Sequence, residues 1–198
     1  MPKFDLAKAK FRCQPHFRIG SIEIEFSIND ATNIAITGAN AVVLVADSDF
    51  IKIDGLHVIN SPMQGIVAYI SSNIVIQNCY TDLTWKSGIA VWGDKMLQEI
   101  SQYVYVYDNE VSRANSWDAP GADLTARQPP HEAISFGRVE DFEIAGNVVH
   151  GGNKAGIDAK GPNHRGRIFN NTVYNLERVA LYVDGWTSPM SDIEIFNN

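Results

Sequence analysis

The chain has 198 residues, a formal net charge of −7 at pH 7, and 45% hydrophobic residues. This length and apolar content allow one sizeable buried core, and the low proportion of charged residues argues against disorder. The negative charge argues against a nucleic-acid partner, because phosphate binding needs clustered Lys and Arg, and no apolar run is long enough to predict a membrane partner.

Residues 1–41 are predicted to form an N-terminal cap and a first irregular turn of the domain. The segment FDLAKAKFR is expected to form one or two amphipathic turns there, with Phe4 and Phe11 as its apolar contacts. The leading MPKFDLAKAKFRC carries Lys and Asp where an export signal needs an apolar stretch, so the segment contains no signal-peptide pattern. The sequence therefore predicts no particular localisation.

From residue 42 to residue 198 a short apolar strand recurs at steps of 23, 45, 23 and 24 residues. Each copy starts with Gly or Ala followed by Ile or Leu, and the copies are GIVAY from Gly65, GIAVW from Gly88, AISFG from Ala133, GIDAK from Gly156 and ALYVD from Ala180. A period near 23 built from strands, with no helix between them, indicates a solenoid whose successive turns, here called rungs, stack on one another.

Side chains alternate between two faces along each of these strands. One face is predicted to form an inward apolar stack of Ile66, Ile89, Ile134, Ile157 and Leu181. The other face is predicted to lie outside, and it changes from apolar to ionisable along the chain: Val67, Tyr69, Ala90, Trp92, Ser135, Gly137, Asp158, Lys160, Tyr182 and Asp184.

A second strand of each rung ends in an Asn corner, at Asn78, Asn109, Asn147, Asn171 and Asn198. Asn tolerates the left-handed backbone region, and its amide can bond to the backbone of a neighbouring turn. Stacked rung over rung, these amides are predicted to form a ladder. Cys79 follows the first corner in an apolar run and is predicted to be a buried, unpaired thiol.

The period breaks once, between Gly88 and Ala133, where insertions are predicted at 93–102 and 116–130. Long insertions on a solenoid usually form loops on one face, often the binding face. The second insertion contains prolines, a Trp and several charges. Two interpretations stay open: a lid beside a substrate groove, or a surface loop without a ligand.

From about residue 40 the chain resembles the right-handed parallel β-helix proteins of the pectate-lyase-like superfamily, of the bacterial carbohydrate-active type. The likeness lies in HEAISFG from His131, GIDAKGPNHRGRIFNN from Gly156 and LYVDGW from Leu181. It implies an all-β fold, a right-handed parallel β-helix, and glycan chemistry, since relatives with an assigned function are mostly polysaccharide lyases and glycoside hydrolases. Full-length relatives would be expected to be secreted.

The candidate catalytic residues are Asp184, Asp158, Lys160 and Glu132. Asp158 and Asp184 lie two strand positions apart on adjacent rungs, which gives a Cα separation of about 8 Å. Carboxyl separations of about 5 to 9 Å then cover both retaining and inverting glycosidases. In a hydrolase, Lys160 would keep Asp184 ionised as nucleophile or base, while Asp158 or Glu132 would serve as general acid.

Three alternatives remain open for this cluster. Lys160 and Asp184 could form a plain ion pair. In a polysaccharide lyase, Lys160 would be the base, and Arg165, Arg167 or Arg178 would neutralise a uronate carboxylate. In a non-catalytic glycan-binding or structural β-helix, only the contact residues would matter. In every case that binds a glycan, the predicted contact residues are Trp92, His131, Tyr182, Trp186 and Arg178.

No cofactor and no metal are predicted. HEAIS lacks the second His of a zinc-binding helix, and a calcium site at Asp118, Asp123 and Glu132 would lack a defined ligand spacing. The predicted partner is a polysaccharide or oligosaccharide. SDIEIFNN stops at an Asn corner without a polar cap, so the C-terminal end is predicted to be uncapped: either the chain is a fragment of a longer β-helix, or another chain packs end to end there.

Overall fold

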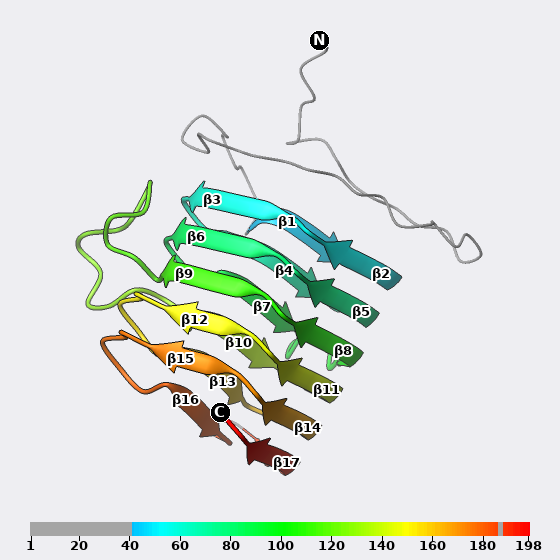
Figure 1. Cartoon of the computed structure of the whole chain (residues 1–198). Helices are drawn as coiled ribbons and strands as arrows, with labels where there is room; N and C mark the ends of the chain where they lie inside the picture. Colours follow the sequence, from blue (N-terminus) through cyan, green and yellow to red (C-terminus); the bar gives the residue numbers. More distant parts are fainter. Residues whose placement is uncertain (1–40, 186–187) are drawn as a thin grey trace.

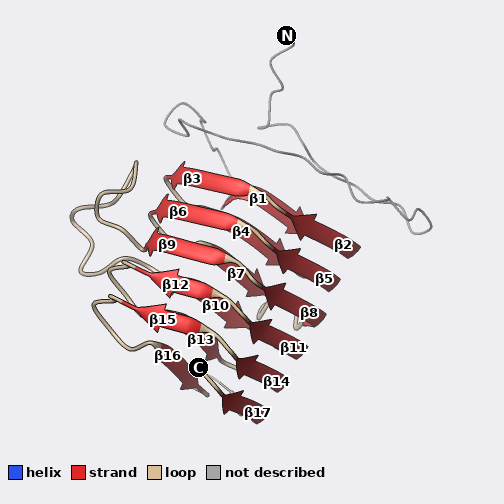
Figure 2. Ribbon diagram, viewed as in Figure 1, coloured by secondary structure: helices blue, strands red, loops and turns tan. Residues whose placement is uncertain are grey.

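The computed structural model describes residues 41–185 and 188–198, and over these ranges the chain forms strands and turns without a helix. The strands wind as a parallel β-helix in which successive rungs add strands to three sheets (Figure 1). Figure 2 shows the loops at the corners between the sheets. This part of the chain accordingly contains no helix with the length and apolarity needed to span a membrane.

Neighbouring strands in all three sheets are parallel. Sheet 1 contains β1 (Ala41–Ala46), β4 (Gln64–Tyr69), β7 (Ile89–Trp92), β10 (Ile134–Gly137), β13 (Ile157–Lys160) and β16 (Leu181–Asp184). Sheet 2 contains β2 (Asp49–Asp54), β5 (Ser72–Gln77), β8 (Ser101–Tyr107), β11 (Val139–Ala145), β14 (His164–Phe169) and β17 (Ser191–Phe196). Sheet 3 contains β3 (His57–Ser61), β6 (Tyr80–Thr84), β9 (Glu110–Ala114), β12 (Val148–His150) and β15 (Thr172–Tyr174).

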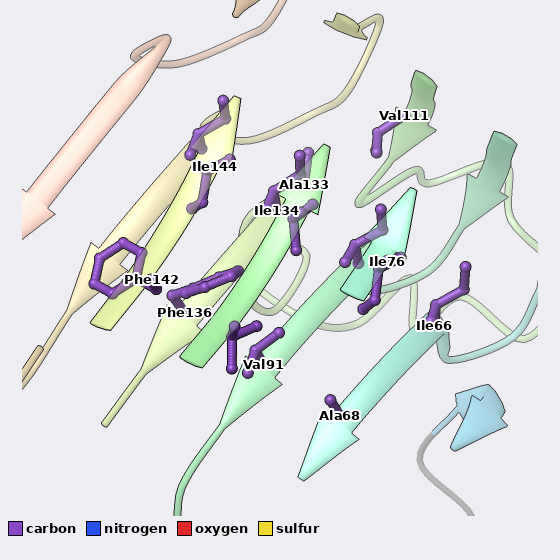
Figure 3. Packing of buried hydrophobic residues seen from close by; sticks show 14 of the residues in the cluster. Ile66, Ala68, Ile76, Val91, Val111, Ala133, Ile134, Phe136, Phe142 and Ile144 are labelled. Carbon is purple, nitrogen blue, oxygen red and sulfur yellow. The ribbon is translucent and has the colours of Figure 1, made fainter. Parts of the chain in front are cut away.

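The predicted inward stack is confirmed. Its members are register partners on successive strands of sheet 1, and all but the last are 0% exposed: Ile66, Ile89, Ile134, Ile157 and Leu181. Leu181 is partly buried against the same core. Side chains of sheet 2, such as Ile144, meet the stack from the other side (Figure 3). Stacked in register, these branched side chains form one continuous core along the axis.

The small residue that opens each repeat lies where the chain bends closely against its neighbours. A Cβ on Gly156 would lie 2.6 Å from Val173 Cγ1 and 2.6 Å from the carbonyl oxygen of Ala180 on the next rung. A Cβ on Gly88 would lie 2.5 Å from Val111 Cγ1. At Gly88 and Gly156 the corner therefore has no room for a Cβ, which explains why these two copies of the motif begin with Gly.

The predicted Asn ladder is confirmed for four of its five members. Asn109 Nδ2 donates to Asn147 Oδ1 at 2.9 Å, and Asn147 Nδ2 donates to Asn171 Oδ1 at 3.0 Å. Asn171 Nδ2 continues the chain to Asn198 Oδ1 at 2.8 Å. Each buried amide thus links one rung to the next.

Asn78 is the exception, and its place in the ladder was predicted wrongly. Its backbone is left-handed, with φ of 52°, and its amide donates to Asp54 Oδ1 on the surface. The next residue, Cys79, is buried as predicted and occupies the ladder position, since its backbone N–H donates to Asn109 Oδ1 at 2.9 Å. Two adjacent columns of residues therefore differ in role: one column turns the chain, and the next column links the rungs by hydrogen bonds.

The insertions leave the coil at two different corners. The sequence separation between stacked partners is 30 residues for Cys79 and Asn109, 38 for Asn109 and Asn147, and 24 for Asn147 and Asn171. The shorter insertion follows β7, where the chain forms a small turn bridged between Asp94 and Glu99. The longer insertion lies between β9 and β10.

We call residues 116–130 the lid loop. Its base is closed by Asn115, whose Nδ2 donates to the carbonyl oxygen of His131 at 3.1 Å. Just inside the base, Trp117 packs against Trp85, with ring centroids 5.3 Å apart. It remains a prediction that the lid loop forms one wall of a substrate groove.

The division of the chain into residues 1–41 and 42–198 also stays a prediction. Almost all of the first range, including the expected amphipathic turns and Cys13, lies outside the described residues.

Candidate functional site

The outer face of sheet 1 carries the candidate site, and its register is the predicted one. Asp158 of β13 pairs with Tyr182 of β16, and Lys160 pairs with Asp184. Asp158 was expected on an exposed surface, and this expectation is wrong: the residue is 0% exposed, whereas Tyr182 is 40% exposed. In the column of Asp158 the middle strands are closed to solvent, at Val67, Ala90, Ser135 and Asp158, whereas Leu44 of β1 and Tyr182 of β16 at the two ends are exposed.

Asp158 is buried because charged side chains from neighbouring segments gather around it. Lys160 Nζ lies 2.9 Å from Asp158 Oδ2 and also forms an ion pair with Glu132 Oε2. Lys154 Nζ lies 3.2 Å from Glu132 Oε1. We call these four residues the acid–lysine cluster; it joins β13 to the segment before it and to the end of the lid loop.

The ion pair expected between Lys160 and Asp184 is not formed. Lys160 lies beside Asp184 in the register but pairs with Glu132 and Asp158, which are buried and therefore have the greater need of a counter-charge. Asp184 instead accepts a hydrogen bond from Tyr182 Oη at 2.7 Å. The cluster and the Tyr182–Asp184 pair thus lie side by side on adjacent strands.

The two carboxyl groups of the cluster differ in protonation. Burial raises the pKa of Asp158 to about 8, and the negative charge of Glu132 acts in the same direction. Burial alone would also raise the pKa of Glu132, but the adjacent Asp158 carboxyl and the ammonium groups of Lys160 and Lys154 outweigh it and lower the pKa. Near neutral pH, Asp158 therefore holds a proton while Glu132 is ionised.

Lys160 keeps its charge in this environment. Burial alone would lower its pKa, but the carboxyl groups of Asp158 and Glu132 raise it above the ordinary value. The side chain has a relative exposure of 28%, so the ammonium group borders solvent while it bridges both acids.

An aromatic pair lies beside the cluster. The rings of Trp92 and His131 have centroids 4.7 Å apart, and Trp92 lies over Gly137, whose added Cβ would be 3.3 Å from Trp92 Cδ1. Burial lowers the pKa of His131 to about 4, helped by positive charges that include Lys160. His131 is therefore a neutral imidazole, and its φ of 64° marks a strained junction between the lid loop and β10.

Comparison with known protein families assigns this chain to a family. A family model described as a right-handed beta helix region matches residues 20–198. The chain belongs to the right-handed β-helix family. No curated protein and no solved structure gives a significant match. The match confirms the predicted fold class, a right-handed parallel β-helix.

In this right-handed β-helix two further predicted contact residues are not seen to pair with the cluster, because one is unpaired and the other falls outside the described residues. Arg178 is exposed on the connection between β15 and β16 and has no ion pair with any described residue. Trp186 falls in the short gap at 186–187, outside the described residues.

Arg165 and Arg167 lie on sheet 2, away from the outer face of sheet 1, and acids already neutralise them. Arg165 pairs with Glu140 and Asp141, both at 2.7 Å. They therefore cannot serve the lyase role considered from the sequence. A surface hollow of about 340 Å³ also lies on sheet 2, between β14 and β17.

The three residues considered for calcium are not brought together. Asp123 caps its own turn through the backbone N–H of Thr125 at 2.9 Å, and Glu132 is held by two lysines. In residues 41–185 and 188–198, no three His, Cys, Asp or Glu side chains converge into a metal-binding group.

Lys86 is the part of the site that sequence reasoning missed. Its positive charge lowers the pKa of His131, which places it near the imidazole. The signal was present in the repeat: the residues two positions before each small residue include Lys86, His131, Lys154 and Arg178. Stacking places these positions in one column, a basic edge beside the outer face of sheet 1.

Proposed function

We propose that this β-helix protein is a carbohydrate-active enzyme, a glycoside hydrolase acting on an oligosaccharide or polysaccharide at the outer face of sheet 1. One observation carries the proposal: two buried carboxyl groups, one with a raised and one with a lowered pKa, share one lysine beside a solvent-facing carboxylate on the next strand. Glycosidic hydrolysis needs one carboxylic acid and one carboxylate on either side of the scissile bond.

Asp184 is the proposed nucleophile or base. It lies on β16, the last strand of the face, beside the exposed Tyr182, and accepts a hydrogen bond from Tyr182 Oη at 2.7 Å. The register and standard strand spacings put its Cα about 8 Å from that of Asp158. This spacing allows a sugar between the Asp184 carboxylate and the cluster.

The Glu132–Asp158 pair is the proposed source of the proton. Asp158 holds the proton but is 0% exposed, whereas Glu132 is 5% exposed and nearer to solvent. The proton would therefore pass from Asp158 to Glu132 and from Glu132 to the leaving oxygen. A carboxyl group whose pKa is raised by burial suits the acid role at neutral pH.

The proposed sugar contacts surround these groups. Trp92 and the neutral ring of His131 offer apolar surface to the C–H face of a sugar ring, and Tyr182 offers a second aromatic surface on the last rung. Trp186 and Arg178 remain predicted contacts on the segments that flank β16.

Two observations bear on the alternatives. A lyase base must lose its proton, and the two acids that raise the pKa of Lys160 make it a poor base. The burial of Glu132 and Asp158 favours a second candidate, a non-catalytic glycan-binding β-helix in which the cluster only holds the rungs together. Activity measurements separate these candidates.

The test is cleavage of a panel of neutral and acidic oligosaccharides, measured as the release of reducing ends. Asp184→Asn and Glu132→Gln should each lower kcat by roughly 10³-fold. Asp192→Asn, an exposed carboxylate on sheet 2, is the matched control and should leave kcat unchanged.

Other outcomes would replace the proposal. Unsaturated uronate products that disappear in Lys160→Ala would indicate a lyase. Glycan retention without cleavage, weakened by Trp92→Ala, would indicate a binding protein. Full activity in Asp184→Asn would refute the assigned role of that residue.

A further inference from the structure

Each carboxyl group of the cluster has a buried serine one rung before it in the stack. Ser135 is the register partner of Asp158, and extension of the same register puts Ser87 beside Glu132. Ser87, Ser135 and Asp158 are all 0% exposed. The hydroxyl groups of both serines make no hydrogen bond with any described residue.

The neighbours of Ser135 in the register offer no nearer partner. Ala90 precedes it on β7, and Tyr182, which follows Asp158 on β16, directs its hydroxyl to Asp184. Asp158 itself is held by Lys160, whose Nζ lies 2.9 Å from Oδ2, and by a hydrogen bond with the Glu132 carboxyl group. Buried polar groups in native proteins are nearly always satisfied by protein or ordered water, so the unpartnered Ser135 hydroxyl points to a bound molecule.

The spacing between rungs indicates that this bound molecule is water. Stacked side chains on adjacent parallel strands are about 4.8 Å apart, which is too long for a direct hydrogen bond of about 2.8 Å between two oxygens. Two such bonds meeting at one water oxygen at a tetrahedral angle span about 4.6 Å. One water therefore fits between Ser135 Oγ and the Asp158 carboxyl group.

We propose that Ser135 is a positioning residue for the acid pair, and that it and Asp158 form a binding site for one water molecule through which the Ser135 hydroxyl supports Asp158 in both protonation states. A serine hydroxyl is both donor and acceptor, and so is water. The bridge can donate to the ionised carboxylate and accept from the protonated acid after a rotation of the hydroxyl.

The charged and titratable groups that face Asp158 would respond to the same change. Lys160 on its own strand contacts Oδ2, Glu132 adds a negative charge from the segment before β10, and Tyr182 lies beside it on β16. Lys154 acts through Glu132. When the acid pair loses its proton, Lys160 and the water bridge are the groups that stabilise the second negative charge.

The consequence for catalysis rests on the proposed function. When the pair gives its proton to a leaving oxygen, the bridge would turn to donate to Asp158, and reprotonation from solvent would restore the starting state. Ser135 would then set the pH range of turnover. The water site itself does not depend on any catalytic activity.

The test compares Ser135→Ala with Thr81→Val. Thr81 is a matched control, since its hydroxyl is also buried and without a hydrogen bond to the described residues, but it lies on sheet 3. Two measurements are made on the full chain: the carboxyl ¹³C titration of Asp158 by NMR, and Tm at about pH 6 and about pH 9, on either side of the Asp158 pKa of about 8.

In Ser135→Ala the pKa of Asp158 should rise by about one unit, because the bond lost by the ionised form is charge-assisted and stronger than the bond lost by the protonated form. Its Tm should fall more at the higher pH than at the lower pH. Ser135→Thr, which keeps the hydroxyl, should restore the wild-type titration. Thr81→Val should leave the Asp158 titration unchanged.

If Ser135→Ala raises Tm equally at both pH values and leaves the Asp158 titration unchanged, the inference is overturned. The Ser135 hydroxyl would then be a buried group without a hydrogen-bond partner. Failure of the proposed function would look different. The titration and Tm effects would then appear as described in a protein that cleaves no glycan.

Discussion

At the scale of single residues, Asp158 shows how a solenoid creates an unusual chemical environment. Its side chain points away from the apolar core, yet it is 0% exposed because Glu132 and Lys160 gather over it. Removing a carboxyl group from water favours its neutral form. Asp158 is therefore a buried acid on the outer face of the coil, with one lysine as its only ion-pair partner in the described chain.

This environment predicts a pH dependence of stability. The pKa of Asp158 is about 8 in the folded state, against about 4 in an unfolded chain, so the folded state binds more protons between these values. The contribution of Asp158 is thus fully present below about pH 4 and is lost as the pH rises through about 8. Asp158→Asn should flatten the fall of the free energy of unfolding over this range, as measured by urea denaturation at a series of pH values.

The exposed Asp192 provides the comparison, and Asp192→Asn should leave the pH profile of the wild type intact. An identical pH profile for wild type and Asp158→Asn would mean that Asp158 is ionised near neutral pH.

At the scale of the elements, the Asn ladder links the rungs through buried amides. Asn147 Nδ2 donates to the carbonyl oxygen of Val106 at 2.9 Å and to Asn171 Oδ1 at 3.0 Å, and its Oδ1 accepts from Asn109. Asn147→Ala would leave several of these partners unsatisfied, so we expect a loss of about 2 to 4 kcal/mol in the free energy of unfolding. Denaturant titration measures it.

Asn78→Ala is the matched control for the ladder, because among the described residues the Asn78 side chain hydrogen-bonds only to the surface carboxylate of Asp54. Asn78→Ala should lower the free energy of unfolding by at most about 0.5 kcal/mol, apart from the effect of the left-handed backbone at this position. Equal costs for the two substitutions would show that the ladder adds nothing beyond a turn preference.

A second element-scale prediction concerns the contact between β11 and β14. Gly166 is the register partner of Phe142, and a Cβ on Gly166 would overlap the Phe142 ring, which also packs on Phe136. Gly166→Ala should therefore cost about 1 to 3 kcal/mol by overpacking.

The double variant Phe142→Leu with Gly166→Ala should recover part of that loss, because the smaller side chain makes room for the new methyl group. Additive losses in a double-mutant cycle, measured by denaturant unfolding, would argue against direct overlap of the two residues.

At the scale of the whole molecule, stability is carried by contacts between neighbouring rungs, and the lid loop lies outside this stack (Figure 1). Asn115 closes the base of the loop, and the backbone N–H of Ser116 donates to Thr84 at 2.9 Å. Replacing residues 122–127 with a short Gly-Ser linker should therefore lower Tm by only a few degrees, since loop length costs little free energy. A thermal melt tests this.

The same variant addresses the groove. If the lid loop walls a substrate site, its shortening should raise KM for a long oligosaccharide more than for a short one. An equal change in KM for both lengths would identify it as a surface loop without a ligand.

The sequence by itself determined the rung length, the inward stack and the neighbours of each outer residue. Asp158 beside Tyr182 and Lys160 beside Asp184 followed from counting positions, and both pairs are present. These features are predictable because strand alternation and a fixed repeat are local rules, and one rung copies the register of the last.

Only the tertiary structure decided which outer residues meet solvent and which charges pair. Lys160 joins Glu132 rather than its register neighbour Asp184, and Asp158 is buried. Glu132 reaches the cluster from the end of the insertion before β10, whose path no periodic pattern encodes, whereas Lys154 stands at the repeating position two residues before Gly156. Because burial sets the protonation of Asp158, the chemistry of the site depends on that irregular segment, whereas the scaffold depends on the repeat.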